Sequence, residues 1–222
     1  MVTDAWAEAQ QRRRLGMVNG QLRTGGVVDQ VVLAAFLEVP RERFVPKNLV
    51  DLAYLDRQLP ARGAKRRRLL APLTLARLIQ AASVKPGERV LDVGGGSGYG
   101  AAILERMGAK VVLLESDAGA AAVAREELAG KNVEVVEGPL NEGVPGLAPF
   151  HVIVIDGAFK VFPEALFAEL ADGGRLVGVD ALSGASRAML YDKDGEAISA
   201  RALLEVGADV LDGFQASASF AF

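Results

Sequence analysis

Apolar residues follow two different patterns along the chain, and the change falls at Pro86-Gly87. Before this point, apolar positions recur at the spacing that is typical of amphipathic helices. They predict a helix that runs to about residue 18, a second helix that Pro40 ends, and a third that begins at Pro72. After this point, short runs of Val, Ile and Leu alternate with amphipathic stretches.

The second part of the chain therefore has the pattern of strands that alternate with helices. Near-continuous apolar runs indicate strands buried on both faces, as in a parallel sheet covered by helices. We predict an α/β fold with a doubly wound, mostly parallel sheet and a helical N-terminal segment. The expected strands are 89–94, 110–115, 132–137, 151–156 and 174–180, the expected helices lie near 98–108, 117–129 and 162–171, and weaker strands are expected at 187–192 and 201–206.

Composition narrows the chemistry that the chain can perform. It contains no cysteine, which excludes disulfides, thiolate metal sites and a cysteine nucleophile, and its single histidine excludes a multi-histidine metal site. We expect that residue, His151, to be a solvated loop residue rather than a catalytic base. A formal net charge of −3 gives no reason to expect nucleic-acid or membrane binding. We expect a cytoplasmic protein that is a monomer or a weak dimer.

Residues 89–100, RVLDVGGGSGYG, predict a strand that runs into a glycine-rich turn and then into a helix. In a parallel sheet such a turn binds ligands at the carboxyl end of the strand, because glycine lets the backbone come close and the helix offers free N–H groups. A dinucleotide would use the loose GxGxxA frame at Gly96, Gly98 and Ala101. Spacing alone therefore leaves a dinucleotide possible.

A second cofactor competes for the same turn. The spacing Asp92-x-Gly94-x-Gly96-x-Gly98 resembles the first motif of class I S-adenosylmethionine methyltransferases. Glu115 ends the next predicted strand, and a carboxylate there can accept hydrogen bonds from ribose hydroxyls of either cofactor. The turn and Glu115 together leave the choice open.

Phrases in the N-terminal third separate the two cofactors. In sequence order they resemble protein-L-isoaspartate O-methyltransferases, a family of class I methyltransferases, and the likeness covers about residues 15–180. The phrases are Met17-Val-Asn-Gly-Gln-Leu-Arg23, Val39-Pro-Arg-Glu-Arg-Phe-Val-Pro46 and Asp51-Leu-Ala-Tyr-Leu-Asp-Arg-Gln-Leu-Pro60, followed in the core by Val90-Leu-Asp-Val-Gly-Gly-Gly-Ser-Gly-Tyr99, Phe162-Pro-Glu-Ala-Leu166 and Gly173-Gly-Arg-Leu-Val177.

The resemblance implies an S-adenosyl-L-methionine cofactor and methylation of the abnormal isoaspartyl carboxylate in damaged proteins or peptides. Such a carboxylate is ionised at pH 7, so its methylation needs no general base. The resemblance also implies one Rossmann-like methyltransferase domain over 1–222, with an acceptor-side segment (1–85), a cofactor-binding core (86–185) and C-terminal strands (186–222). The residues it assigns to the cofactor are Asp92, Gly94, Gly95, Gly96, Ser97, Gly98, Glu115, Gly138 and Leu140.

Two departures from the family pattern concern the acceptor and the adenine. When the chain is anchored on Pro72, the family's substrate-contacting serine falls on Leu70, and neighbouring polar positions fall on Arg68 and Ala71. A substrate oxygen left unpaired there would cost about 1–3 kcal/mol in a dry site. After the third strand, Pro139 takes the family's acidic position beside the adenine and brings neither a side-chain acceptor nor an N–H.

Several interpretations stay open. The run Lys65-Arg-Arg-Arg68 is either a solvated loop or an altered acceptor mouth that prefers acidic groups or phosphate. Asp156 is a candidate catalytic residue that shapes the pocket or caps the next turn; with Asp180 it could begin a Mg²⁺ site, although we expect no metal. Besides isoaspartyl methylation, two functions compete: a non-catalytic cofactor-binding descendant that acts as a sensor or partner, and a small-molecule O-methyltransferase.

Overall fold

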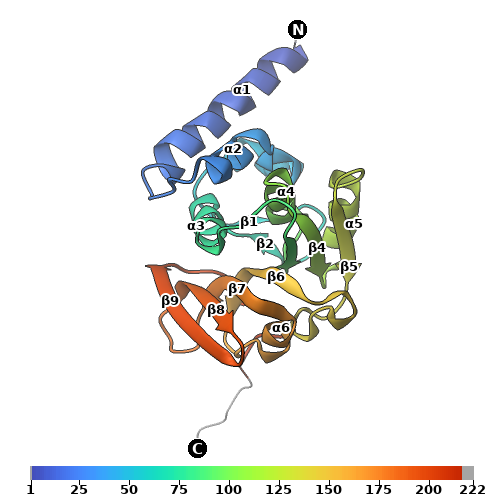
Figure 1. The fold of residues 1–222 in the computed structure, drawn as a ribbon. Coiled ribbons are helices and arrows are strands. Elements are labelled where there is room, and N and C mark those ends of the chain that lie inside the picture. The colour runs from blue at the N-terminus through green and yellow to red at the C-terminus, as the bar shows by residue number, and fades with distance from the viewer. Residues whose placement is uncertain (1, 217–222) are drawn as a thin grey trace, which may run out of the picture.

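The computed structural model describes residues 2–216, with side chains from residue 5 onward; the last part of the predicted C-terminal segment, 217–222, lies outside the described residues. Helix α1 (Val2–Met17) projects away from the body of the molecule (Figure 1) and continues into a π-helical turn, Val18–Leu22. Helix α2 (Gln30–Glu38) begins after Asp29, whose carboxylate accepts the Val31 N–H at 2.8 Å and so caps the helix.

The sheet confirms the predicted doubly wound, mostly parallel arrangement. Its strand order is β5-β4-β3-β6-β7-β8-β9; the first five of these are parallel to one another, β8 is antiparallel to β7, and β9 is antiparallel to β8. The chain order reverses between β3 and β6, which is where ligands bind in sheets of this kind. The strands are β3 (Arg89–Val93), β4 (Lys110–Glu115), β5 (Val133–Glu137), β6 (Phe150–Phe159), β7 (Leu170–Asp180), β8 (Arg187–Asp194) and β9 (Ala197–Glu205).

Two predicted boundaries were wrong. The helix expected at 162–171 is only α6 (Glu164–Ala168), because the chain already pairs with β6 at Leu170, opposite Phe150. His151 lies inside β6 rather than in a loop; its side chain is exposed, and its Nδ1 accepts the Arg89 N–H at 3.1 Å.

Helices cover one face of the sheet more fully than the other. The first face packs against α3 (Pro72–Ala82), α4 (Tyr99–Arg106) and α5 (Ala118–Glu127). The second face is covered by α6, by 3-10 turns at Leu140–Glu142 and Pro145–Leu147, and by residues from the segment after β9. This second core contains Leu166 of α6 together with Leu211 and Phe214. The segment after β9 is thus part of the core.

A small hairpin lies outside the main sheet. Its strands, β1 (Leu59–Pro60) and β2 (Arg68–Leu69), are antiparallel, and Leu59 pairs with Leu69. The loop between them carries Lys65, Arg66 and Arg67 of the basic run, and the hairpin brings Arg67 beside Gly96 of the glycine turn. In the part of the chain that the structure describes, no helix has the length and apolarity needed to cross a bilayer.

Candidate functional site

The glycine turn leaves β3 at Val93 and enters α4 at Tyr99. Gly94 and Gly98 adopt φ angles of +74° and +98°, which side-chain-bearing residues rarely reach, so glycine is needed at both positions. The hydroxyl of Ser97 is buried and donates to the Phe44 carbonyl at 2.6 Å, so this side chain fastens the turn to the N-terminal segment.

Glu115 stands at the carboxyl end of β4 and is fully buried. Its Oε2 accepts the Gly96 N–H at 2.8 Å, and its Oε1 accepts two further backbone N–H groups, those of Ser116 and Asp117, each at 2.8 Å. Its Oε2 also pairs with Arg67 Nε at 3.3 Å. The carboxylate predicted to hold ribose hydroxyls is therefore already bonded to the chain's own groups on both oxygens.

Two carboxyl groups lie beneath the turn. A Cβ atom on Gly100 would lie 2.9 Å from Asp156 Oδ2 and 3.1 Å from Asp92 Oδ2, so the two side chains flank the same point. Both oxygens of Asp92 are buried without a hydrogen-bond partner. Burial, then the charges of Asp156 and Glu115, raises the pKa of Asp92 well above its usual range. Burial also raises the pKa of Asp156 to about 7, against the opposing charges of Arg41 and Arg67.

Leu70, at the position of the family's serine, is buried and lies beside a buried arginine. Arg41 is fully buried; its Nη2 donates to the Leu70 carbonyl at 2.8 Å, and its guanidinium stacks 4.8 Å from the centre of the Tyr99 ring. Burial lowers the pKa of Arg41 and raises that of Tyr99 to about 12. The charge of Arg41 also acts on Asp156, so the two predicted acceptor-side residues, Leu70 and Asp156, share one buried cluster.

The remaining predicted cofactor residues lie around the same turn. A Cβ on Gly94 would come within 3.3 Å of Leu140 Cδ1, and the Gly138 N–H donates to the Glu115 carbonyl at 3.1 Å. Asp180, by contrast, accepts the Tyr191 hydroxyl at 2.6 Å and the Leu182 N–H at 2.7 Å, so its carboxylate is engaged elsewhere. Among the described residues, no three His, Cys, Asp or Glu side chains are grouped to hold a metal ion.

The basic run is not simply a solvated loop. Arg66 is exposed, but the side chain of Arg67 is only 6% exposed and reaches Glu115. No sequence signal shows which member of such a run is buried. Arg41 occurs in one of the family-like phrases without any assigned role, and Leu211, described below, lies beyond the family-like region. Arg67, Arg41 and Leu211 were therefore not identified from the sequence as residues of the site.

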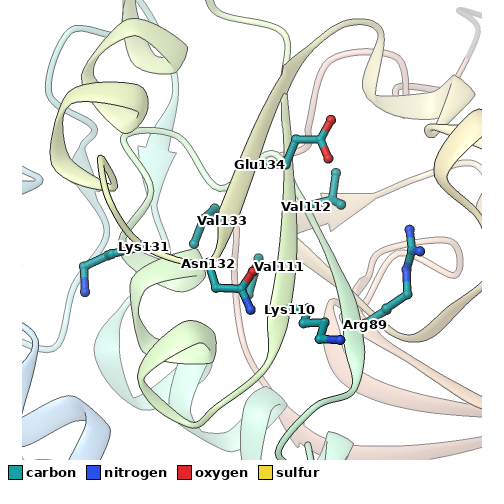
Figure 2. A pocket seen from close by; sticks show the side chains of 8 residues that line it. All are labelled: Arg89, Lys110, Val111, Val112, Lys131, Asn132, Val133 and Glu134. Carbon is teal, nitrogen blue, oxygen red and sulfur yellow. The ribbon is translucent and has the colours of Figure 1, made fainter.

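Cavities lie at both ends of the parallel strands. One of about 390 Å³ lies at the starts of β3, β4 and β5, at the sheet edge opposite the glycine turn, where Lys110, Lys131 and Glu134 border it (Figure 2). Another, of about 190 Å³, borders Asp156 and Gly157 and is lined on its other sides by arginines of the basic run and by residues 209–212.

The residues around the turn fit S-adenosylmethionine chemically, but the chain's own side chains fill the space. The glycine turn and the strand-end carboxylate of Glu115 are the groups that such a cofactor needs. However, a Cβ on Gly96 would lie 3.2 Å from Arg67 Cγ, and one on Gly94 would lie 2.8 Å from Leu211 Cδ1. The side chains of Arg67 and Leu211 therefore pack directly against these two glycines.

Comparisons with known proteins agree with the resemblance in the sequence. The model of the protein-L-isoaspartate (D-aspartate) O-methyltransferase family matches residues 13–207. A protein-L-isoaspartate O-methyltransferase of Koribacter versatilis is 41% identical over 167 residues, 74% of each chain. That of Gloeobacter violaceus is 43% identical over 164 residues, 72% of this chain and 79% of the relative.

Solved structures show the same fold. One protein-L-isoaspartate O-methyltransferase aligns with a TM-score of 0.77 at 29% identity, covering 90% of this chain, which spans 66% of that protein. A Plasmodium falciparum β-aspartate methyltransferase, solved with S-adenosyl-L-homocysteine, aligns with a TM-score of 0.73 at 21% identity, over 88% of this chain and 96% of that one. The Rossmann-like methyltransferase fold and enzyme class predicted from the sequence are confirmed. The chain belongs to the protein-L-isoaspartate (D-aspartate) O-methyltransferase family.

Proposed function

We propose that this protein transfers a methyl group from S-adenosyl-L-methionine to the isoaspartyl carboxylate of a protein or peptide. The observation that carries the proposal is the family match over residues 13–207, which includes the acceptor-side segment as well as the core. The glycine turn and Glu115, joined by the 2.8 Å bond from the Gly96 N–H, support the choice of cofactor. A cytoplasmic location and a monomeric or weakly dimeric state stay predictions from the sequence.

Methyl transfer to a carboxylate needs few functional side chains. The cofactor supplies an electrophilic methyl group, and the acceptor carboxylate is already ionised at pH 7. The protein's part is to align the two and to exclude water. Glu115 would accept ribose hydroxyls, Gly138 and Leu140 would line the adenine, and Asp92, which has unpartnered oxygens beneath the turn, would place the turn. No residue has to act as a general base.

Leu70 is the residue that we expect to limit transfer. It is buried beside Arg41 and offers no hydroxyl to the acceptor. We expect Leu70→Ser to raise the rate of methyl transfer to an isoaspartyl peptide by roughly tenfold, the effect of one recovered hydrogen bond of about 1.4 kcal/mol. The measurement is the release of base-labile methyl ester after incubation with labelled cofactor.

Leu70→Ala is the matched control, because it removes the same bulk without adding a hydroxyl. An ordinary aspartyl peptide of the same sequence should accept no methyl group. If Leu70→Ser and Leu70→Ala transfer equally, the serine position has been assigned to the wrong residue. If neither variant nor the native protein modifies the isoaspartyl peptide, its methylation is not the function.

A second candidate is a non-catalytic member of the family that binds the cofactor or its product and acts as a sensor or partner. The presence of Leu70 at the serine position and the pairing of Arg67 with Glu115 favour it. Calorimetry with S-adenosyl-L-homocysteine separates the two candidates. Binding without transfer to isoaspartyl peptide, even in Leu70→Ser, would support the non-catalytic role.

A further inference from the structure

The segment after β9 returns to the ligand-binding edge of the sheet. The Ala158 N–H donates to the Asp209 carbonyl at 2.9 Å, and the Leu211 N–H donates back to the Ala158 carbonyl at 2.9 Å. Further along, the Lys160 N–H donates to the Phe214 carbonyl at 2.8 Å. Residues 208–214, which we call the C-terminal strap, are thus bound by main-chain hydrogen bonds to the carboxyl end of β6.

The strap places Leu211 in the crevice where the strand order reverses. Leu211 is only 2% exposed, and its side chain lies against the glycine at the end of β3 and the glycine near the end of β6. A Cβ on Gly94 would lie 2.8 Å from Leu211 Cδ1, and one on Gly157 would lie 2.6 Å from Leu211 Cγ. A ligand that binds in this crevice needs the space that Leu211 fills.

Arg67 covers the neighbouring part of the same site. It pairs with the Glu115 carboxylate, and its stem lies over Gly96. A ribose hydroxyl that bonds to Glu115 therefore has to replace a guanidinium. Leu211 and Arg67 reach the turn from segments far apart in the sequence, yet they cover adjacent parts of one ligand site.

Ion pairs connect the strap to the basic run. Asp209 lies 3.6 Å from Arg68 Nε, and Asp212 lies 3.8 Å from Arg67 Nη2. The side chains of Asp209 and Asp212 are 61% and 73% exposed, so these pairs are screened by solvent and weak. The ion pairs therefore add little to the binding of the strap, which depends on its main-chain bonds to β6 and on buried Leu211 and Phe214.

We propose that the C-terminal strap and Arg67 form an internal lid that closes the cofactor site, and that cofactor binds only when this lid opens. The proposal rests on the proposed function, because it takes the crevice to be the cofactor site. The lid makes cofactor affinity depend on the equilibrium between its closed and open states, since only the open fraction binds.

Calorimetric titration with S-adenosyl-L-homocysteine tests the lid in the full-length protein. We expect Leu211→Ala to bind at least tenfold more tightly than the native protein. Leu166→Ala is the matched control, because it truncates a buried leucine of the same core away from the crevice; its affinity should equal the native value. Arg67→Ala gives a second route to the open state that leaves the core intact, and it should also bind more tightly.

Hydrogen exchange supplies a readout that does not depend on activity. The amide of Leu211 is bonded to Ala158, and saturating S-adenosyl-L-homocysteine should speed its exchange by releasing the strap. Tight binding by the native protein with an unchanged Leu211 amide would overturn the lid and leave the proposed function intact. Failure of the native protein and of both opened variants to bind would overturn the lid and the cofactor assignment together.

Discussion

Replacement of Glu115 by alanine is expected to lower the free energy of unfolding by about 3–5 kcal/mol, the cost of leaving a buried charge without its partner. The Arg67 side chain, 6% exposed, would lose the carboxylate that holds it. The N–H groups of Gly96, Ser116 and Asp117 would lose their acceptor as well. Urea denaturation of the native protein and of Glu115→Ala measures this loss, provided that the free energy of unfolding depends on urea concentration with the same slope in both.

Replacement of Arg67 by alanine should lower the free energy of unfolding much less. In Arg67→Ala the Glu115 carboxylate keeps its three backbone N–H donors, so the remaining charge still has hydrogen-bond partners. The double variant should therefore be more stable than the sum of the single losses predicts, with a coupling of about 0.5–3 kcal/mol. If the losses of the two single variants simply add in the double variant, Arg67 and Glu115 do not interact as a buried ion pair. The exposed pair of Arg106 with Glu38 is the control, and its coupling should be much weaker because solvent screens it.

The parallel core was predictable because each of its strands is buried on both faces, so nearly every residue of the run is apolar. Val90 and Leu91, adjacent in β3, point into the two different cores of the protein, and both are buried. The boundary between α6 and β7 was not predictable in this way. Pairing of Leu170 with Phe150 decides it, and that partner lies twenty residues earlier along the chain.

The same distinction between local rules and long-range packing holds for the candidate site. The glycine turn and Glu115 could be placed from the sequence because local rules govern them: a turn follows a strand, and a carboxylate ends the next one. Arg67 and Leu211 could not be placed, because the packing of a hairpin and of the C-terminal strap decides where they lie. The sequence therefore predicts which groups could hold a cofactor, but not that the chain covers them itself.

Asp92 should make the protein less stable as the pH rises, because its pKa is raised in the folded state by burial and by the charges of Asp156 and Glu115. The folded protein keeps a proton that the unfolded chain releases above about pH 4, so stability falls from that pH upward until the folded carboxyl also ionises. The neighbouring Asp156, with a pKa raised to about 7, adds to the loss over the same range. Neutral pH therefore lies on the falling side of the stability curve for this pair.

Asp92→Asn removes the ionisable group while keeping its shape. We expect it to be more stable than the native protein at pH 8, where the unfolded chain has released the proton that the folded protein keeps, and to show little advantage at pH 4.5. Thermal unfolding at both pH values measures the difference, with Asp194→Asn, an exposed aspartate of β8, as control. Parallel pH profiles for native protein and Asp92→Asn would mean that Asp92 ionises in the folded protein as it does in the unfolded chain, and would contradict the raised pKa.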